Sequence, residues 1–187
     1  MPKPLDELQE DIDNRKEKLR FLVALFFAGL LTLAKWREAM QNEIEALYIQ
    51  SFVLGFGGGL DMIGEADWQR LQAVLDQHYQ YLDKFTRDMG QMSEAQAAAR
   101  AALYAQSAYQ AYSVGYEQKV GGGRLHLPAY PGDISTECGS NCRCHWRIAN
   151  RSDGGCDCFW EIDAQAESCK DCWERAEKWW PLTLYPA

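Results

Sequence analysis

The stretch that decides the fold is residues 127–173, LPAYPGDISTECGSNCRCHWRIANRSDGGCDCFWEIDAQAESCKDCW, which contains all seven cysteines of the chain. The cysteines follow the patterns C-x3-C-x-C, C-x-C and C-x2-C. An odd number of cysteines at such short spacings is typical of thiolate metal ligands rather than of paired disulfides. We interpret the stretch as a small β-module held by a metal ion in a reducing compartment.

Two segments on either side of residues 149–155 alternate in residue type. Residues 142–148 place Cys, Cys, Trp and Ile on one face and basic side chains on the other, and residues 156–162 repeat the pattern with acidic side chains opposite. A period of two predicts a β-hairpin. Its pairing should bring Cys144 and Cys158 onto the same side as two tryptophans, Trp146 and Trp160.

The last cysteine pair opens the segment CKDCWERAEKWWPL, which predicts a short helix closed by Pro181. Two thiols at positions i and i+3 of a first helical turn can chelate one ion, and the free N–H groups there stabilise thiolates. Zn²⁺ in structural sites takes four S or N ligands in a tetrahedron. We expect one structural Zn²⁺ held by Cys138, Cys142, Cys169 and Cys172, with Cys144 and Cys158 as reserve ligands.

The cysteine pattern also allows other metal sites or bonds. Cys156 is the cysteine that we expect not to bind the ion. His145 would bring the number of candidate ligands to eight, which is enough for two ions. Disulfides, an iron–sulfur centre and redox-active thiols are the alternatives to zinc. A catalytic zinc is not expected, because the chain lacks a motif such as H-E-x-x-H that supplies a general base.

Residues 1–120 predict a helical platform. Gly29 is the one interior glycine over about residues 5–53, which can form one long helix or two abutting helices. Apolar residues at three- and four-residue steps predict a second helix over about 65–89, in which His78 is expected to be a core histidine. A capping box, Ser93 with Gln96, precedes a third helix over about 94–118.

The glycines at 121–123 mark a change of composition, so residues 121–187 are assigned to a separate cysteine-rich, zinc-binding module. The predicted fold class is therefore α+β and mostly α. A bundle of long N-terminal helices is followed by a small zinc-stapled β-hairpin module with a short C-terminal helix.

The apolar run FLVALFFAGLLTLA, residues 21–34, follows an acidic segment and lacks a small-residue cleavage site, so it is not expected to be a secretory signal. Its 14 residues are fewer than the ~20 that a membrane-spanning helix needs. Because the run is apolar on every side, we expect a buried core or subunit-packing helix. Contact with lipid is the alternative.

The formal net charge is −8, and both parts of the chain are acidic. A protein whose main task is to grip a phosphate backbone normally presents a net positive face. Nucleic acid is therefore not expected as the primary partner, although a local contact is left open.

Four segments occur in a recognisable order: RAALYAQSAYQAYSVGYEQ, then LPAYPGDISTECGSNCRCHWRI, CDCFWEI and CKDCWERAEKWWPL. Over about residues 93–184 this order resembles the C-terminal region of tailed-phage minor head proteins, the Mu F-like head-morphogenesis group. The N-C-R-C element from Asn141 to Cys144 is the most telling piece. The chain is shorter than members of that group, so a specialised decoration, adaptor or accessory subunit also fits.

The resemblance implies a non-catalytic structural or assembly component of a phage or prophage-derived head, near the portal or inner capsid. It would be found in the virion and, during assembly, in the cytoplasm of the bacterial host. Its partners would be the portal or major capsid protein and further copies of itself as a homo-oligomer, with no small-molecule substrate and no membrane. The alternative is a zinc-dependent nucleic-acid-binding or regulatory module, in which tryptophans would stack on bases.

Overall fold

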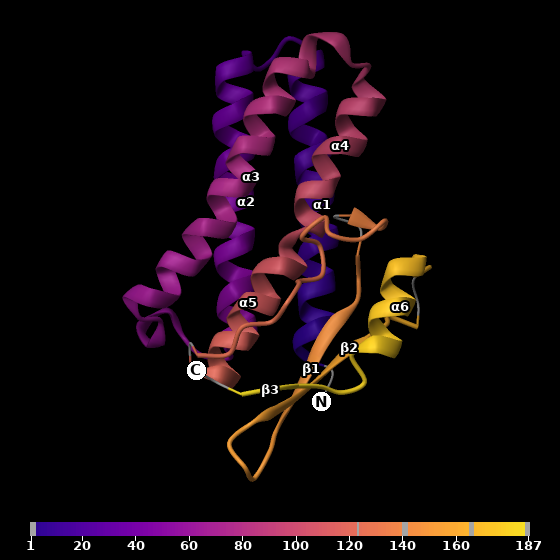
Figure 1. Cartoon of the computed structure of the whole chain (residues 1–187). Helices are drawn as coiled ribbons and strands as arrows, with labels where there is room; N and C mark the ends of the chain where they lie inside the picture. The colour runs from indigo at the N-terminus through magenta and orange to yellow at the C-terminus, as the bar shows by residue number, and fades with distance from the viewer. Residues whose placement is uncertain (1–2, 123, 140–141, 165–166, 186–187) are drawn as a thin grey trace.

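The computed structural model describes residues 3–122, 124–139, 142–164 and 167–185 (Figure 1). Two residues used above, Gly123 and Asn141, lie outside this range. The long helices are α1 (Lys3–Phe27), α2 (Leu33–Phe56), α3 (Glu65–Asp88), α4 (Glu94–Gln106) and α5 (Ala108–Gly121). They are followed by β1 (His145–Asn150), β2 (Cys156–Glu161), α6 (Lys170–Lys178) and β3 (Leu182–Leu184), and two short 3-10 helices are η1 (Leu60–Met62) and η2 (Met89–Gln91). The predicted class, α+β and mostly helical, is confirmed.

The N-terminal region forms two helices rather than one helix over residues 5–53. Gly29 lies between them with φ of 73°, a left-handed conformation that favours glycine. Thr32 then caps α2, because its side chain accepts a hydrogen bond from the Lys35 backbone N–H at 3.3 Å. The chain therefore turns back, and α1 packs against both α2 and α4.

Within this chain the apolar run is not a buried core helix, so that expectation is wrong, and the packing of the run on another subunit stays a prediction. Val23 is fully buried, but Phe21 is 61% exposed and Leu30 is 71% exposed. The reason is that the run spans the end of α1 and the turn, where only one face of the helix meets the bundle. Among the described residues, no helix has both the length and the apolar character needed to cross a membrane.

The third predicted helix is also divided. Its capping box is present, since Gln96 N donates to Ser93 Oγ at 3.3 Å and Ser93 N donates to Gln96 Oε1 at 2.9 Å. At Ser107 the helix breaks into α4 and α5, and the Ser107 hydroxyl donates to the Leu103 carbonyl at 3.2 Å. The second predicted helix corresponds closely to α3, in which His78 is buried as expected.

Helices α2 and α5 cross at very short range. A Cβ atom added at Gly115 would lie 2.2 Å from the Phe52 carbonyl oxygen, and one added at Gly55 would lie 2.0 Å from the Tyr112 carbonyl oxygen. The two glycines therefore allow the two backbones to touch. This crossing fixes the position of α5, which in turn packs against β1.

The predicted hairpin is confirmed, with β1 beginning at His145 rather than at residue 142. The strands pair antiparallel, with Trp146 opposite Trp160 and Ile148 opposite Cys158. The sequence did not predict β3, which pairs with the other edge of β2 and gives the strand order β1-β2-β3. The strand that carries Cys158 is therefore central.

Tryptophans form the core of this small sheet. The Trp146 ring lies 5.2 Å from Trp160 and 5.3 Å from Trp179, measured between centroids. The Trp146 indole N–H also donates to the Ala129 carbonyl at 2.8 Å. The loop before the strands is thus tied to the sheet, and Tyr116 of α5 packs against the same cluster.

Candidate metal centre

The first cysteine pair lies in a tight loop ahead of β1. Gly139 N donates to the Thr136 carbonyl at 2.8 Å, and Cys142 N donates to the Gly139 carbonyl at 3.3 Å. Gly139 adopts a φ of 56°. The resulting turns bring Cys138, which is partly buried, and Cys142, which is buried, to the same side of the loop.

The second pair lies at the start of α6, as the C-x2-C spacing predicts. Cys169 is the N-cap residue, with extended backbone, and its carbonyl accepts from Cys172 N at 3.1 Å. Cys172 is fully buried in the first turn. Its thiol therefore faces the loop rather than the solvent.

Polar contacts dock the loop onto α6. The backbone N–H of Glu137, next to Cys138, donates to Asp171 Oδ2 at 2.8 Å. The Arg175 guanidinium donates to the Ser135 carbonyl at 2.8 Å and to the Ser135 hydroxyl at 3.1 Å. Asp171 and Arg175 hold the ligand-bearing loop in register with the helix, as outer-shell residues do in metal sites. The cysteine spacing does not predict this role for either residue, although both lie within three residues of Cys172.

Three thiols meet between the loop and the helix. Cys142 Sγ lies 3.5 Å from Cys172 Sγ, and Cys138 Sγ lies 3.7 Å from Cys172 Sγ. A tetrahedral Zn²⁺ with bonds of about 2.3 Å to sulfur separates its sulfur ligands by about 3.8 Å. A disulfide would bring two sulfurs to about 2.05 Å, and all seven cysteines are free. Cys138, Cys142 and Cys172 thus form a group that can hold a metal ion.

Two further thiols flank this group. Cys144 contacts the thiols of Cys142 and Cys172, whereas Cys169 contacts those of Cys138 and Cys172. Cys169 and Cys144 are therefore the candidates for a fourth ligand, although neither belongs to the group of three thiols whose sulfur atoms lie within 4.8 Å of one another. The structure thus brings together three of the four predicted ligands, Cys138, Cys142 and Cys172, and it places Cys169 in a second group with the carboxylates of Glu137 and Asp171.

Close contacts among the thiols lower the pKa of one cysteine and raise the pKa of its neighbours. Contacts with the Cys144 and Cys172 thiols lower the pKa of Cys142 to about 3. Contact with Cys142 raises the pKa of Cys144 to about 12, and contacts with Cys142 and Cys144 raise the pKa of Cys172. One thiolate is thus stabilised by neighbours that keep their protons, and a divalent cation at the centre would favour the thiolate form of its ligands.

The remaining candidates lie elsewhere. Cys158 is buried in the sheet core, where burial raises its pKa to about 12, and it does not belong to the group of thiols around Cys172. The Cys156 thiol donates to Asn150 Oδ1 at 3.5 Å, in keeping with its expected role as the spare. His145 Nε2 lies 3.2 Å from Glu161 Oε2 on the neighbouring strand. Among the described residues, these three therefore do not form a second metal-binding group.

No protein-family model matches the chain, and comparisons with curated proteins and with solved structures find no similar protein either. Functional interpretation therefore rests on the sequence motifs and on the geometry of the cluster.

Proposed function

We propose that this chain is a non-catalytic structural component of a phage or prophage-derived head, a minor capsid or portal-associated protein. The order of the sequence motifs over about residues 93–184 supports this assignment. The observation that carries it is the thiol cluster, in which Cys138, Cys142 and Cys172 lie together at ligand spacing and largely out of solvent. Such a site stabilises a shape and needs no general base.

The metal that fits this site best is structural Zn²⁺, with Cys169 as the fourth ligand. Thiolate sulfur is a preferred ligand of Zn²⁺, and C-x2-C at a helix start supplies two ligands from a single turn. Cys144 would then lie beside the ligands and contact the Cys142 sulfur. The ion would join the loop to α6 and so fix the module as one rigid unit.

An apolar tip at the α1–α2 turn supports a role in assembly. It consists of exposed Phe21, Phe27, Leu30 and Leu33. Exposed apolar side chains mark a surface that is covered in an assembly where they form one contiguous patch. We assign the tip to self-association or to contact with the portal or major capsid protein, in the virion and in the cytoplasm of the bacterial host during assembly.

Native mass spectrometry of the purified chain, with and without a chelator, tests the proposal. We expect a homo-oligomer that contains zinc, and co-purification with a portal or major capsid protein expressed from the same genome. A chain that stays monomeric and associates with neither head protein would contradict the head assignment, while its zinc content would still report on the metal site separately.

A zinc-dependent nucleic-acid-binding module is the alternative. The observation in its favour is an exposed aromatic and basic face, where the Arg147 guanidinium lies 3.8 Å from the Phe159 ring centre and Trp180 is 57% exposed. The acidic charge of the chain opposes it. DNA binding that weakens steeply with salt would favour this alternative, and no binding would favour the head assignment.

A further inference from the structure

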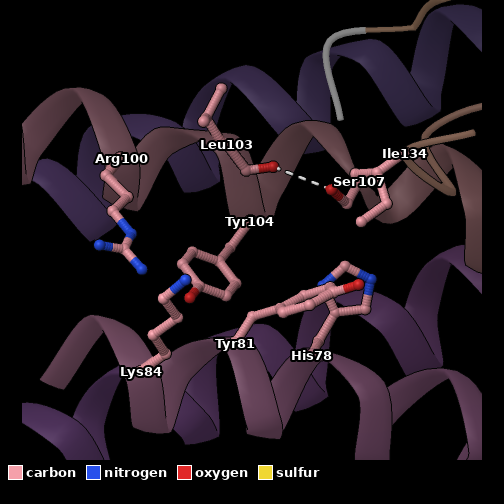
Figure 2. Close-up of a pocket in the computed structure, with 8 residues that line it drawn as sticks. All are labelled: His78, Tyr81, Lys84, Arg100, Leu103, Tyr104, Ser107 and Ile134. Atoms are coloured by element: carbon pink, nitrogen blue, oxygen red, sulfur yellow. Dashed lines mark hydrogen bonds between the residues drawn. The ribbon is translucent and has the colours of Figure 1, made fainter. Parts of the chain in front are cut away.

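A pocket of about 250 Å³ lies between α3 and α4 (Figure 2). Helix α3 packs on α2 and α5, whereas α4 packs mainly on α1, so the two walls are held by different neighbours. The residues that line the pocket are His78, Tyr81, Lys84, Arg100, Leu103, Tyr104, Ser107 and Ile134. Ile134 comes from the loop that precedes the thiol cluster, so both parts of the chain build the pocket.

One end of the pocket is positively charged. Figure 2 shows the side chains of Lys84 and Arg100 pointing toward each other from the facing helices. Arg100 donates to Asp88 Oδ2 at 2.9 Å, whereas the Lys84 ammonium has no hydrogen bond or ion pair within the described part of the chain. None of the lining residues is acidic, and the nearby Asp83 is paired with Arg37 at 2.6 Å. An anion entering here would therefore gain two cationic neighbours.

Two phenol groups add hydrogen-bond donors to the pocket: Figure 2 shows the Tyr104 hydroxyl beside Lys84, and the Tyr81 hydroxyl pointing toward His78. The Tyr104 side chain is 7% exposed, and its hydroxyl has no hydrogen-bond partner among the described residues. Burial raises the pKa of Tyr104, so the group stays an O–H donor. The Tyr81 hydroxyl accepts from Gln77 Nε2 at 3.0 Å, which leaves its own proton free to donate.

The rest of the pocket is apolar and fixed in shape. His78, which is 3% exposed, lies 3.2 Å from both the Tyr48 hydroxyl and Gln110 Oε1, so its two ring nitrogens are already engaged. Ile134 has a φ of 59°, an uncommon conformation for a β-branched residue. Asp133 supports this turn by accepting from Ser135 N at 2.9 Å. The Ile134 side chain, half-exposed, therefore closes the pocket at the end opposite the cations.

We propose that this pocket binds a carboxylate carried on a single aromatic ring. The carboxylate would lie between Lys84 and Arg100 and accept from the Tyr104 hydroxyl, while the ring would pack between Tyr81 and Ile134. The volume suits one ring and its acid group and is small for a nucleotide. The same chemistry is offered by a free aromatic acid and by an aromatic residue at the C-terminus of a partner chain. This site is independent of the zinc and of the head assignment.

Titration of phenylacetate into the isotope-labelled full chain, followed by NMR, tests the proposal. We expect the amide signals of α3 and α4 to shift, and phenylacetamide, which lacks the charge, to bind at least about tenfold more weakly. Lys84→Met and Tyr104→Phe should each weaken phenylacetate binding by about five- to tenfold. Lys35→Met, at an exposed lysine on α2, should leave it unchanged.

A peptide ending in phenylalanine with a free carboxylate distinguishes the two sources. Tighter binding than phenylacetate assigns the site to a partner terminus, and weaker binding assigns it to a free acid. The spectra themselves report whether each variant keeps its fold. The proposal is overturned if phenylacetate causes no shifts at tens of millimolar, if the amide binds equally well, or if folded Lys84→Met binds as the parent does.

Discussion

The Sγ atoms of Cys142 and Cys172 lie 3.5 Å apart, although the two residues are 30 positions apart in the sequence. One belongs to the loop before β1 and the other to the first turn of α6. A shared cation would relieve the repulsion between two buried thiolates and join these two segments. The cluster therefore links segments that otherwise meet through a few polar contacts and the tryptophan core.

The first prediction concerns metal content. Purified protein should contain about one zinc per chain, as a single tetrahedral site requires. Cys172→Ser should abolish stoichiometric zinc and unfold the module, because structural zinc contributes directly to folding free energy. Cys156→Ser is the matched control, since that thiol contacts Asn150 instead. Elemental analysis and near-UV circular dichroism measure both effects, and metal-free parent protein with reduced thiols would contradict the site.

The second prediction separates the two flanking thiols. Cys169→Ser removes the proposed fourth ligand and should weaken zinc binding by more than about 100-fold, whereas Cys144→Ser should change it by less than about tenfold. Competition with a chelator of known affinity measures the difference. If Cys144→Ser weakens zinc binding more than Cys169→Ser does, Cys144 is the fourth ligand and Cys169 acts only as the N-cap of α6.

The third prediction concerns the docking of the loop on α6. Arg175→Met removes two hydrogen bonds to Ser135 and a guanidinium that lies 5.2 Å from the Trp160 ring centre. We expect a loss of about 1–2 kcal/mol in unfolding free energy, measured by denaturant titration with tryptophan fluorescence. Lys170→Met, at an exposed lysine whose one ion pair among the described residues is with Glu174, should change the unfolding free energy by less than about 0.5 kcal/mol. If both substitutions lower the unfolding free energy equally, Arg175 does not dock the loop on α6.

Local patterns in the sequence predicted much of this fold. Alternation of cysteine and tryptophan predicted the hairpin and the side chains that share its buried face, because one face had to be buried. Apolar periodicity predicted α3, and the C-x2-C spacing predicted the start of α6. In these cases the deciding contacts are close in sequence or follow from a single repeated spacing.

Other features depend on contacts that no local pattern carries. The sequence left open whether the helix breaks at Gly29, because a single glycine is tolerated inside a helix, and the turn is favoured by the packing of α1 on α2 and α4. The three residues of β3 become a strand because β2 offers a free edge. At the candidate metal site, the C-x2-C spacing favoured Cys169 over Cys144, but the meeting of three thiols depends on how the loop approaches α6, which no cysteine spacing encodes.

The fourth prediction concerns the crossing of α2 and α5. Gly115→Ala would force a methyl group against the Phe52 carbonyl, at an unrelaxed distance of 2.2 Å. The helices must separate, which should cost about 1–3 kcal/mol in unfolding free energy. Gly90→Ala is the control, because its Cβ would meet no atom within 4 Å. Thermal unfolding of both variants gives the comparison, and an unchanged Gly115→Ala variant would show that the helices do not cross this closely.

The last prediction concerns the pH dependence of stability. Burial lowers the pKa of His78 from its ordinary value of 6.5 to about 4. Between these two pH values the unfolded chain binds a proton at this site that the folded chain does not bind, so stability falls as the pH falls. The contribution of His78 is complete above pH 6.5 and is lost toward pH 4, with a magnitude on the order of 3 kcal/mol.

His78→Gln should therefore show a shallower loss of stability between pH 6.5 and pH 4 than the parent protein. Protonation of the cluster thiols also destabilises the fold in acid, but it affects both proteins alike, so the difference between them isolates the imidazole. NMR titration gives a direct check, since an imidazole of His78 that titrates near its ordinary pKa would contradict the buried, neutral state held by Tyr48 and Gln110.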